Sequence, residues 1–235
     1  MNQPTTRATT RPTTRPTSGR PATQFTFIRH GETDWNRQQR FQGQIDVPLN
    51  DVGLAQASRL GQRLAGEPAD VLVASDLMRT RQTAEPLARA WQQGPQLMPG
   101  FREQNFGVLE GLDVPTIRER HPDLWADWLV HRADFALPGG ESLRQFHQRV
   151  MAAVRELAEQ HAGRSVTVVT HGGVLDMLWR SAHQQPLDGL RRCEIPNTGL
   201  NHLRWRDGVL FIDRWADAAH LDGLPAQPST AAGER

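Results

Sequence analysis

Short apolar runs alternate with longer segments of helical periodicity along most of this chain. The runs span five or six residues, are rich in Val and Phe, and have the length of buried strands. The longer segments place apolar side chains three or four positions apart, as amphipathic helices do. Strands that alternate with helices indicate a mainly parallel sheet covered on both faces, so we expect a three-layer α/β/α fold. The strands are predicted at 24–28, 70–74 and 165–170, and the helices at 51–65, 76–91, 142–161 and 174–182.

Polar residues stand where two of these helices should begin. Asn50 and Asp51 are expected to cap the first helix, because side-chain oxygens accept hydrogen bonds from the free N–H groups of a first turn. Ser75 or Asp76 should cap the next one in the same way. The first helix is expected to turn one apolar face to the core, made of Leu54, Ala57, Leu60, Gly61 and Leu64.

The two ends of the chain differ in composition from the body. Residues 1–23 repeat a Thr-Thr-Arg unit and hold almost no apolar side chains, so we expect a disordered tail. A terminal hairpin is predicted at 200–205 and 208–215. The Pro-, Ala- and Gly-rich segment 221–235 is expected to be flexible. The sequence thus predicts one folded domain at 24–220 between two tails.

Arginine supplies all 27 basic side chains, because the chain has no lysine. That absence excludes a P-loop nucleotide site and a Schiff-base lysine, whereas guanidinium groups suit phosphate because they bind its oxygens bidentately. The tail takes four arginines, which leaves 23 basic and 26 acidic side chains, a net charge of about −3, in the rest. A weakly acidic body does not attract nucleic acid, so any anion site must be a local cluster.

The cysteine count and the hydropathy pattern bear on the compartment. Cys193 is the only cysteine, which excludes a disulfide framework or a Cys-rich zinc site within one chain and fits a reducing environment. No apolar run reaches membrane-spanning length, and the first residues lack the apolar stretch of a secretory signal. We therefore expect a cytoplasmic protein that binds neither membranes nor nucleic acid.

Basic residues recur just past predicted strands, at the starts of helices. They are Arg29 with His30, Arg79, and His171 with Gly172. The carboxyl ends of strands in an open α/β sheet border one crevice, and helix N-termini there present free N–H groups to anions. We therefore expect these residues to converge on a bound anion.

A phosphoryl group fits this set of side chains. Arg29 and Arg79 would bind its non-bridging oxygens and neutralise charge in the transition state. His30 is the candidate nucleophile, since neutral imidazole can attack phosphorus to give a phosphohistidine, and His171 could donate a hydrogen bond to the same oxygens. The leaving oxygen also needs a proton, so the site requires an acid.

Other chemistries fit the sequence less well. Two histidines and a carboxylate can form a metal-binding triad, but two guanidiniums would repel a divalent cation, so we expect neither a metal nor a cofactor. A cysteine-phosphatase loop needs an arginine six residues after its cysteine, where Gly199 stands. There is also no Asp-x-Asp pair and no Gly-x-Ser-x-Gly elbow.

The segment Arg-His-Gly-Glu-Thr-Asp-Trp-Asn at 29–36 and the blocks that follow it resemble the histidine phosphatase (phosphoglycerate mutase-like) superfamily. The likeness covers about residues 25–215, in order and at plausible spacing. A single Arg-His-Gly would be a weak signal, whereas several ordered blocks are a specific one. The further blocks are 40–43, 46–53, 74–83, 101–103 with 106–111, 138–142 and 169–173.

The resemblance implies roles for named residues. His30 would be phosphorylated transiently, and Arg29, Arg79 and His171 would form the rest of the phosphate pocket. It makes Glu103 the proton donor, because the family places the acid at the Arg-Glu step. Glu110 is the alternative acid, in a neighbouring matched block. Positions that border the phosphate or substrate are matched by Asn36, Gln42, Gly43 and Gly172.

A small lid is expected at about 104–140, with its central part at 112–137. This segment lacks the longer basic insertion, with paired arginines, of cofactor-dependent phosphoglycerate mutases, and this favours the phosphatase branch of the family. Its tryptophans either line a pocket for a substrate with an apolar or aromatic portion, such as a nucleoside or α-ribazole phosphate, or simply pack the lid. The residues in question are Trp125, Trp128, His131, Arg132 and Phe135.

These observations predict a phosphomonoester hydrolase acting on a small phosphorylated metabolite. A phosphoglycerate mutase and a phosphate-binding protein without turnover are the alternatives. The physiological substrate and the oligomeric state are not determined by the sequence, which leaves a homodimer open.

Overall fold

The computed structural model describes residues 20–227, and the greater part of both expected tails, 1–19 and 228–235, lies outside the described residues. One mixed sheet has the strand order β3-β2-β4-β1-β5-β6. The pairs β1–β4, β2–β4 and β2–β3 are parallel, and β1–β5 and β5–β6 are antiparallel. The strands are β1 (Thr23–Arg29), β2 (Val71–Ala74), β3 (Gln96–Leu97), β4 (Ser165–Thr170), β5 (Leu200–Arg206) and β6 (Val209–Asp217).

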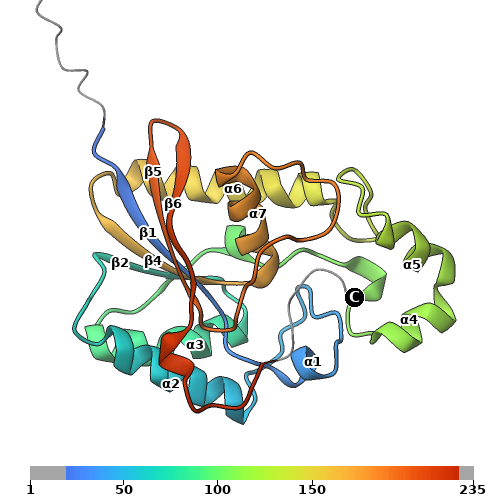
Figure 1. The fold of residues 1–235 in the computed structure, drawn as a ribbon, viewed down its shortest axis with the longest axis horizontal. Coiled ribbons are helices and arrows are strands. Elements are labelled where there is room, and N and C mark those ends of the chain that lie inside the picture. Colours follow the sequence, from blue (N-terminus) through green and yellow to red (C-terminus); the bar gives the residue numbers. More distant parts are fainter. Residues whose placement is uncertain (1–19, 228–235) are drawn as a thin grey trace, which may run out of the picture.

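Helices cover both faces of this sheet, which confirms the predicted three-layer α/β/α fold (Figure 1). Apolar side chains of α6 and α7 pack on one face, against Phe25 and Phe27 of β1. Those of α2 and α3 pack on the other face, against Ile28 and Leu72. The helices are α1 (Asp34–Arg37), α2 (Asp51–Leu64), α3 (Met78–Trp91), α4 (Val114–Arg120), α5 (Pro122–Leu129), α6 (Leu143–Gln160) and α7 (Gly172–Ala182).

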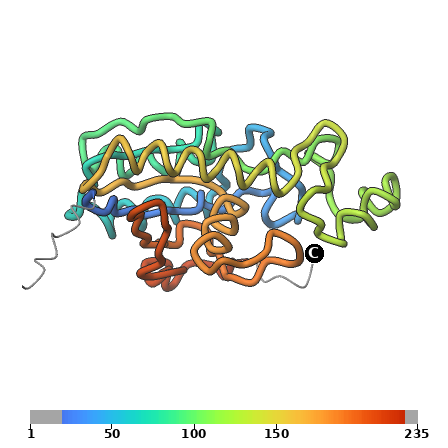
Figure 2. The backbone as a smooth tube through the Cα atoms, turned by 90° about the horizontal axis from the view of Figure 1, so that it is seen from above, coloured from blue at the N-terminus to red at the C-terminus, as the bar shows by residue number. Residues whose placement is uncertain are grey.

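The short helices α4 and α5 lie apart from the sheet, at one end of the molecule (Figure 2). They have a small core of their own, in which Leu109, Ile117, Trp125 and Leu137 are buried. Short single-turn helices at Pro99–Phe101 and Gly107–Leu109 lead into this subdomain, and another stands at Ala219–Leu221. No helix within residues 20–227 is long and apolar enough to cross a membrane.

The cap predicted for α3 is wrong. The helix begins after Leu77, whose side chain makes no capping hydrogen bond. Ser75 instead contacts His171, and Asp76 forms an ion pair with Arg102 at 2.5 Å. Both side chains are thus used in tertiary contacts that no local pattern reveals.

The predicted apolar face of α2 is also partly wrong. Leu54 is 47% exposed, and Gln56 is fully buried in the set of inward-facing residues. The Gln56 amide oxygen accepts a hydrogen bond from the backbone N–H of Glu32 at 2.8 Å, which satisfies the buried polar group. The helix therefore holds the loop after β1 by this hydrogen bond, in addition to packing on the core. The N-cap is Asn50, as predicted.

Candidate active site

The sheet register brings the two central histidines together. Arg29, the last residue of β1, pairs with Thr170, the last residue of the parallel strand β4. His30 and His171 therefore leave the same edge of the sheet, and their ring centroids lie 5.3 Å apart. Both side chains are almost completely buried. Parallel strands end at one edge, so the convergence follows directly from the topology.

A hydrogen bond holds the His30 ring in one tautomer. Its Nδ1 lies 2.7 Å from the carbonyl oxygen of Gly31, and because that oxygen can only accept, Nδ1 carries the proton. Nε2 keeps its lone pair and makes no hydrogen bond with any described residue. Burial lowers the pKa of His30 well below its usual value, and the nearby Arg79 and Arg29 lower it further. The imidazole is therefore neutral at pH 7.

His171 lies fully buried beside this ring. Its Nε2 is 2.9 Å from the Ser75 hydroxyl, while its Nδ1 has no partner among residues 20–227. Burial, followed by the charge of Arg79, lowers the pKa of His171 well below its usual value. A neutral ring with Nε2 accepting from Ser75 would present an Nδ1–H donor to a bound anion.

Arg29 and Arg79 provide the positive charge. Arg79 is completely buried and donates to the carbonyl oxygens of Ile45 and Gly43 at 2.9 and 2.8 Å. Arg29 donates to the carbonyl of Ile195 at 2.7 Å. Burial lowers the pKa of Arg79 to about 10, which leaves it charged at neutral pH. Carbonyl partners orient a guanidinium without cancelling its charge, so the site attracts an anion.

Glu103 places a carboxylate at the same pocket. It accepts hydrogen bonds from the backbone N–H groups of Gln104 and Gly173 at 2.8 and 3.0 Å. A Cβ atom on Gly173 would lie 2.1 Å from the Glu103 carboxylate, so only glycine leaves room for it. The alternative acid, Glu110, accepts from the backbone of Gln44 at 2.9 Å and does not line the pocket.

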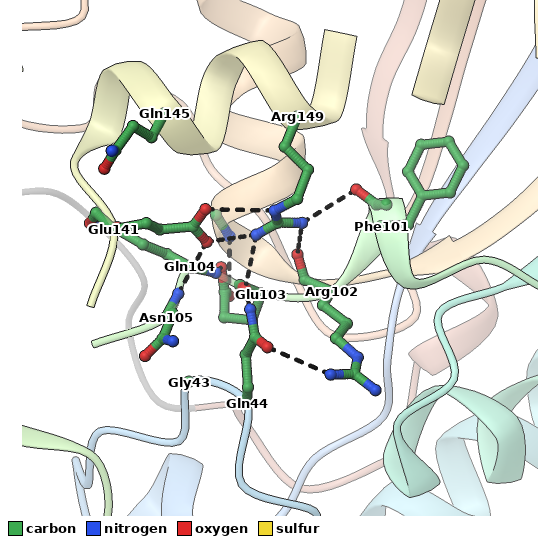
Figure 3. A network of polar contacts seen from close by, with 12 residues as sticks. Gly43, Gln44, Phe101, Arg102, Glu103, Gln104, Asn105, Glu141, Gln145 and Arg149 are labelled. Carbon is green, nitrogen blue, oxygen red and sulfur yellow. Dashed lines mark hydrogen bonds and ion pairs between the residues drawn. The ribbon is translucent and has the colours of Figure 1, made fainter. Parts of the chain in front are cut away.

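A network behind Glu103 fixes its backbone (Figure 3). Arg149 of α6 donates to the carbonyl oxygens of Gly100, Arg102 and Glu103 at 3.0 to 3.1 Å. The same guanidinium forms an ion pair with Glu141. One arginine thus ties the segment that carries Glu103 to a long helix, and this sets the carboxylate against the N-terminus of α7.

A pocket of about 240 Å³ opens over these residues. Two of its lining residues are oriented by Thr33: its hydroxyl donates to the amide oxygens of Asn36 and Gln42 at 3.1 and 3.0 Å. His171 is not among the lining residues, but its ring lies 5.3 Å from that of His30, which is. The predicted site residues that line the pocket are Arg29, His30, Asn36, Gln42, Gly43, Arg79, Glu103 and Gly172.

Residues from the lid and from loops complete the pocket. Of the lid residues considered from sequence, Trp128 and His131 line it. Trp125 is 6% exposed and Phe135 packs in the lid core, while Arg132 pairs with Asp127 on the surface. No sequence pattern assigned a role to several other side chains that line the pocket, which include Trp35, Phe41, Phe106, Arg191 and Asn197.

Asn197 is the missed residue with the most direct contact to His30. Its side-chain amide donates to the carbonyl oxygen of His30 at 2.7 Å. The backbone of Asn197 is in turn held by the Gln227 side chain, which accepts from its N–H at 2.6 Å and donates to its oxygen at 3.2 Å. It lies in a loop without periodicity, so only its position before a predicted strand could have drawn attention to it.

The residues that the structure describes contain no group of three or more His, Cys, Asp or Glu side chains that could hold a metal ion. The charged groups nearest to His30 that act on its pKa are the guanidiniums of Arg79 and Arg29. Positive charge at this position favours a phosphoryl group over a divalent cation.

The depressed pKa of His30 has a consequence for the pH profile. Only the neutral ring is nucleophilic, and the free enzyme keeps it neutral as the pH falls below the usual histidine pKa of 6.5. We therefore expect kcat/KM for a phosphomonoester to stay level through pH 6.5 and to fall only at lower pH. Measuring the profile with two esters whose phosphate groups differ in their second pKa distinguishes ionisation of the substrate from ionisation of the enzyme. If kcat/KM for both esters fell with a midpoint at pH 6.5, the site would not be lowering the pKa of His30.

The chain is similar in sequence and fold to known proteins. The model of the histidine phosphatase superfamily (branch 1) matches residues 25–218. A metal-independent phosphoserine phosphatase of Arabidopsis thaliana is 36% identical over 206 residues, covering 86% of this chain and 84% of the relative. Phosphoglycerate mutase-like protein 4 of the same plant is 34% identical over 217 residues, covering 90% and 93%.

Among solved structures, YhfR of Bacillus stearothermophilus superposes with a TM-score of 0.78 at 28% identity, covering 85% of this chain and all of that one. The family match spans the sheet, both helical layers and the lid. The chain therefore belongs to branch 1 of the histidine phosphatase superfamily.

Proposed function

We propose that this chain is a metal-independent phosphomonoesterase that works through a phosphohistidine at His30. The observation that carries the proposal is the His30 ring, neutral and with Nε2 unprotonated, beside the guanidiniums of Arg29 and Arg79. A buried neutral imidazole next to two cations suits attack on a dianionic phosphoryl group. The cations that would attract the substrate also keep the nucleophile unprotonated.

In the first half-reaction the His30 Nε2 lone pair forms a bond to phosphorus as the ester P–O bond breaks. Glu103, in its protonated form, gives its proton to the leaving oxygen, and an alcohol departs. Arg29, Arg79 and the Nδ1–H of His171 stabilise the charge on the three equatorial oxygens. Asn197 and Gly31 hold the His30 backbone and ring so that the attack is in line.

In the second half-reaction water takes the place of the alcohol. The Glu103 carboxylate, held by two backbone N–H groups, removes a proton from a water molecule as that water attacks phosphorus. The N–P bond breaks, inorganic phosphate leaves, and both His30 and Glu103 return to their starting states. One residue thus serves as acid and then as base.

The substrate we propose is a small phosphorylated metabolite. A pocket of about 240 Å³ leaves room for a phosphoryl group and a modest alcohol portion. Its lining includes Trp35, Phe41 and Trp128, which would contact an apolar part of the leaving group. The phosphoserine phosphatase of Arabidopsis supports a phosphatase role for a chain of this kind.

Phosphate release in the presence of a chelator tests the proposal. We expect turnover of p-nitrophenyl phosphate at the same rate with and without EDTA, because the charge that a metal would supply comes from Arg29 and Arg79. Steady-state release of inorganic phosphate measures it, with a known magnesium-dependent phosphatase as a control for chelation. Loss of activity in EDTA that added metal restores would contradict the mechanism.

A mutase is the second candidate, favoured by the likeness to a phosphoglycerate mutase-like protein. Such an enzyme would pass the phosphoryl group from His30 to a bound hydroxy acid rather than to water. Conversion of 3-phosphoglycerate to 2-phosphoglycerate, dependent on the bisphosphate and faster than phosphate release, would favour the mutase over the phosphatase.

A further inference from the structure

Arg191 lines the catalytic pocket from residues 183–199, the loop between α7 and β5. The first part of this loop is held by Arg180, which donates to the Gly189 carbonyl at 2.9 Å. Beyond Arg191, the carbonyl of Ile195 accepts from Arg29 at 2.7 Å. Because the chain is fixed on both sides of Arg191, the position of this residue beside the pocket is set before a ligand binds.

The Arg191 guanidinium forms no hydrogen bond or ion pair with any residue in 20–227, although its Nε atom is buried. Two other arginines that line the pocket are paired with acids, Arg180 with Asp176 at 3.1 Å and Arg40 with Asp113 at 3.7 Å, while Arg29 and Arg79 donate to backbone carbonyls. A buried donor without a partner is costly in the unliganded protein. Because this donor lies at the edge of a pocket, an acceptor atom of a bound ligand can supply the missing hydrogen bond.

The side chains of Arg191 and Arg29 both lie beside Gly172. A Cβ atom placed on Gly172 would lie 3.4 Å from Arg29 Nε and 3.7 Å from Arg191 Nη1. Arg29 flanks the nucleophile, so Arg191 lies close to the position that the phosphoryl group would occupy. A group that reaches Arg191 must therefore be joined to the phosphoester by only a few atoms.

We propose that Arg191 binds a carboxylate of the substrate and so selects phosphomonoesters of small hydroxy acids. The proposal rests on the proposed phosphatase function and adds a specificity-determining residue to it. A planar guanidinium matches the two oxygens of a carboxylate bidentately. A second phosphoryl group fits less well, because the reacting one is flanked by two arginines and Arg191 is a single uncommitted cation.

A pair of esters that differ only in the carboxylate tests this assignment. O-Phosphoserine and phosphoethanolamine are such a pair, and phosphate release gives kcat/KM for each with the full-length enzyme. In Arg191→Gln we expect kcat/KM to fall by roughly 10- to 100-fold more for O-phosphoserine than for phosphoethanolamine, chiefly through KM. A purely structural role would lower both values together.

Arg192→Gln is the matched control, because Arg192 is exposed, contacts Gln185 at 3.1 Å and does not line the pocket. It should leave the ratio of the two kcat/KM values as in the wild type. An equal loss on both esters in Arg191→Gln, or an unchanged ratio while both are hydrolysed, would overturn the role of Arg191 and leave the phosphatase proposal standing.

If neither these esters nor p-nitrophenyl phosphate were hydrolysed, the phosphatase proposal would fail and calorimetry would decide the role of Arg191. O-Phosphoserine should then bind the wild type at least about 10-fold more tightly than phosphoethanolamine, and Arg191→Gln should remove that difference. Equal affinity of the wild type for both ligands would overturn the assignment.

Discussion

Replacing His30 by alanine is expected to lower kcat for every phosphomonoester by at least about 10⁴-fold, because the variant has no atom that can form the N–P bond. The guanidiniums of Arg29 and Arg79 remain in place, held by backbone carbonyls. The variant should therefore still bind phosphate or a phosphomonoester. Steady-state kinetics and calorimetry together separate loss of chemistry from loss of binding.

His147→Ala is a suitable control for this substitution. His147 is a partly buried histidine of α6, whose Nε2 lies 2.8 Å from the Ser181 hydroxyl of α7, and it does not line the pocket. Its replacement should leave kcat within a few-fold of the wild type. If His30→Ala kept more than about 1% of wild-type kcat while remaining folded, His30 could not be the nucleophile.

Glu103→Gln is expected to have an effect that depends on the leaving group. An alkyl phosphate needs a proton on its departing oxygen, so we expect its kcat to fall by about 10²- to 10³-fold. p-Nitrophenolate leaves without a proton, so formation of the phosphohistidine from p-nitrophenyl phosphate should slow by less than about 10-fold. Rapid-quench measurement of this first step, for both esters, gives the comparison.

The matched control for Glu103 is Glu110→Gln. Glu110 also accepts from backbone N–H groups, those of Gln44 and Phe106 at 2.9 and 3.0 Å, but it stands outside the pocket. Its replacement should change the rate of the first step to a similar extent for both esters. If the leaving-group dependence appeared in Glu110→Gln and not in Glu103→Gln, the two assignments would have to be exchanged.

The sequence predicted the layered fold well because its strands carry a strong signal. β4 begins and ends at the predicted residues, Ser165 and Thr170, since a buried parallel strand is apolar on both faces. β3 has two residues and α1 has four, and elements this short have no periodicity to detect. The caps at Ser75 and Asp76 failed because the partners of these side chains are remote in sequence.

The site residues likewise fall into those that the sequence predicts and those that it does not. His30, Arg29 and His171 follow predicted strands directly, so the topology alone brings them together. Arg149 lies on α6 like any other helix-surface arginine, and its contact with the Glu103 backbone exists only in the folded chain. Residues of this kind act through packing between distant segments, which neither composition nor local pattern encodes.

The most direct test of the account is the chemical identity of the phosphorylated intermediate. Wild-type enzyme mixed with a labelled phosphomonoester and quenched in base should carry label that acid removes, as a phosphohistidine does, and peptide mapping should place it on His30. His30→Ala should take up no label. Label on another residue, or rapid phosphate release with no labelled protein under conditions that slow the second step, would contradict the mechanism.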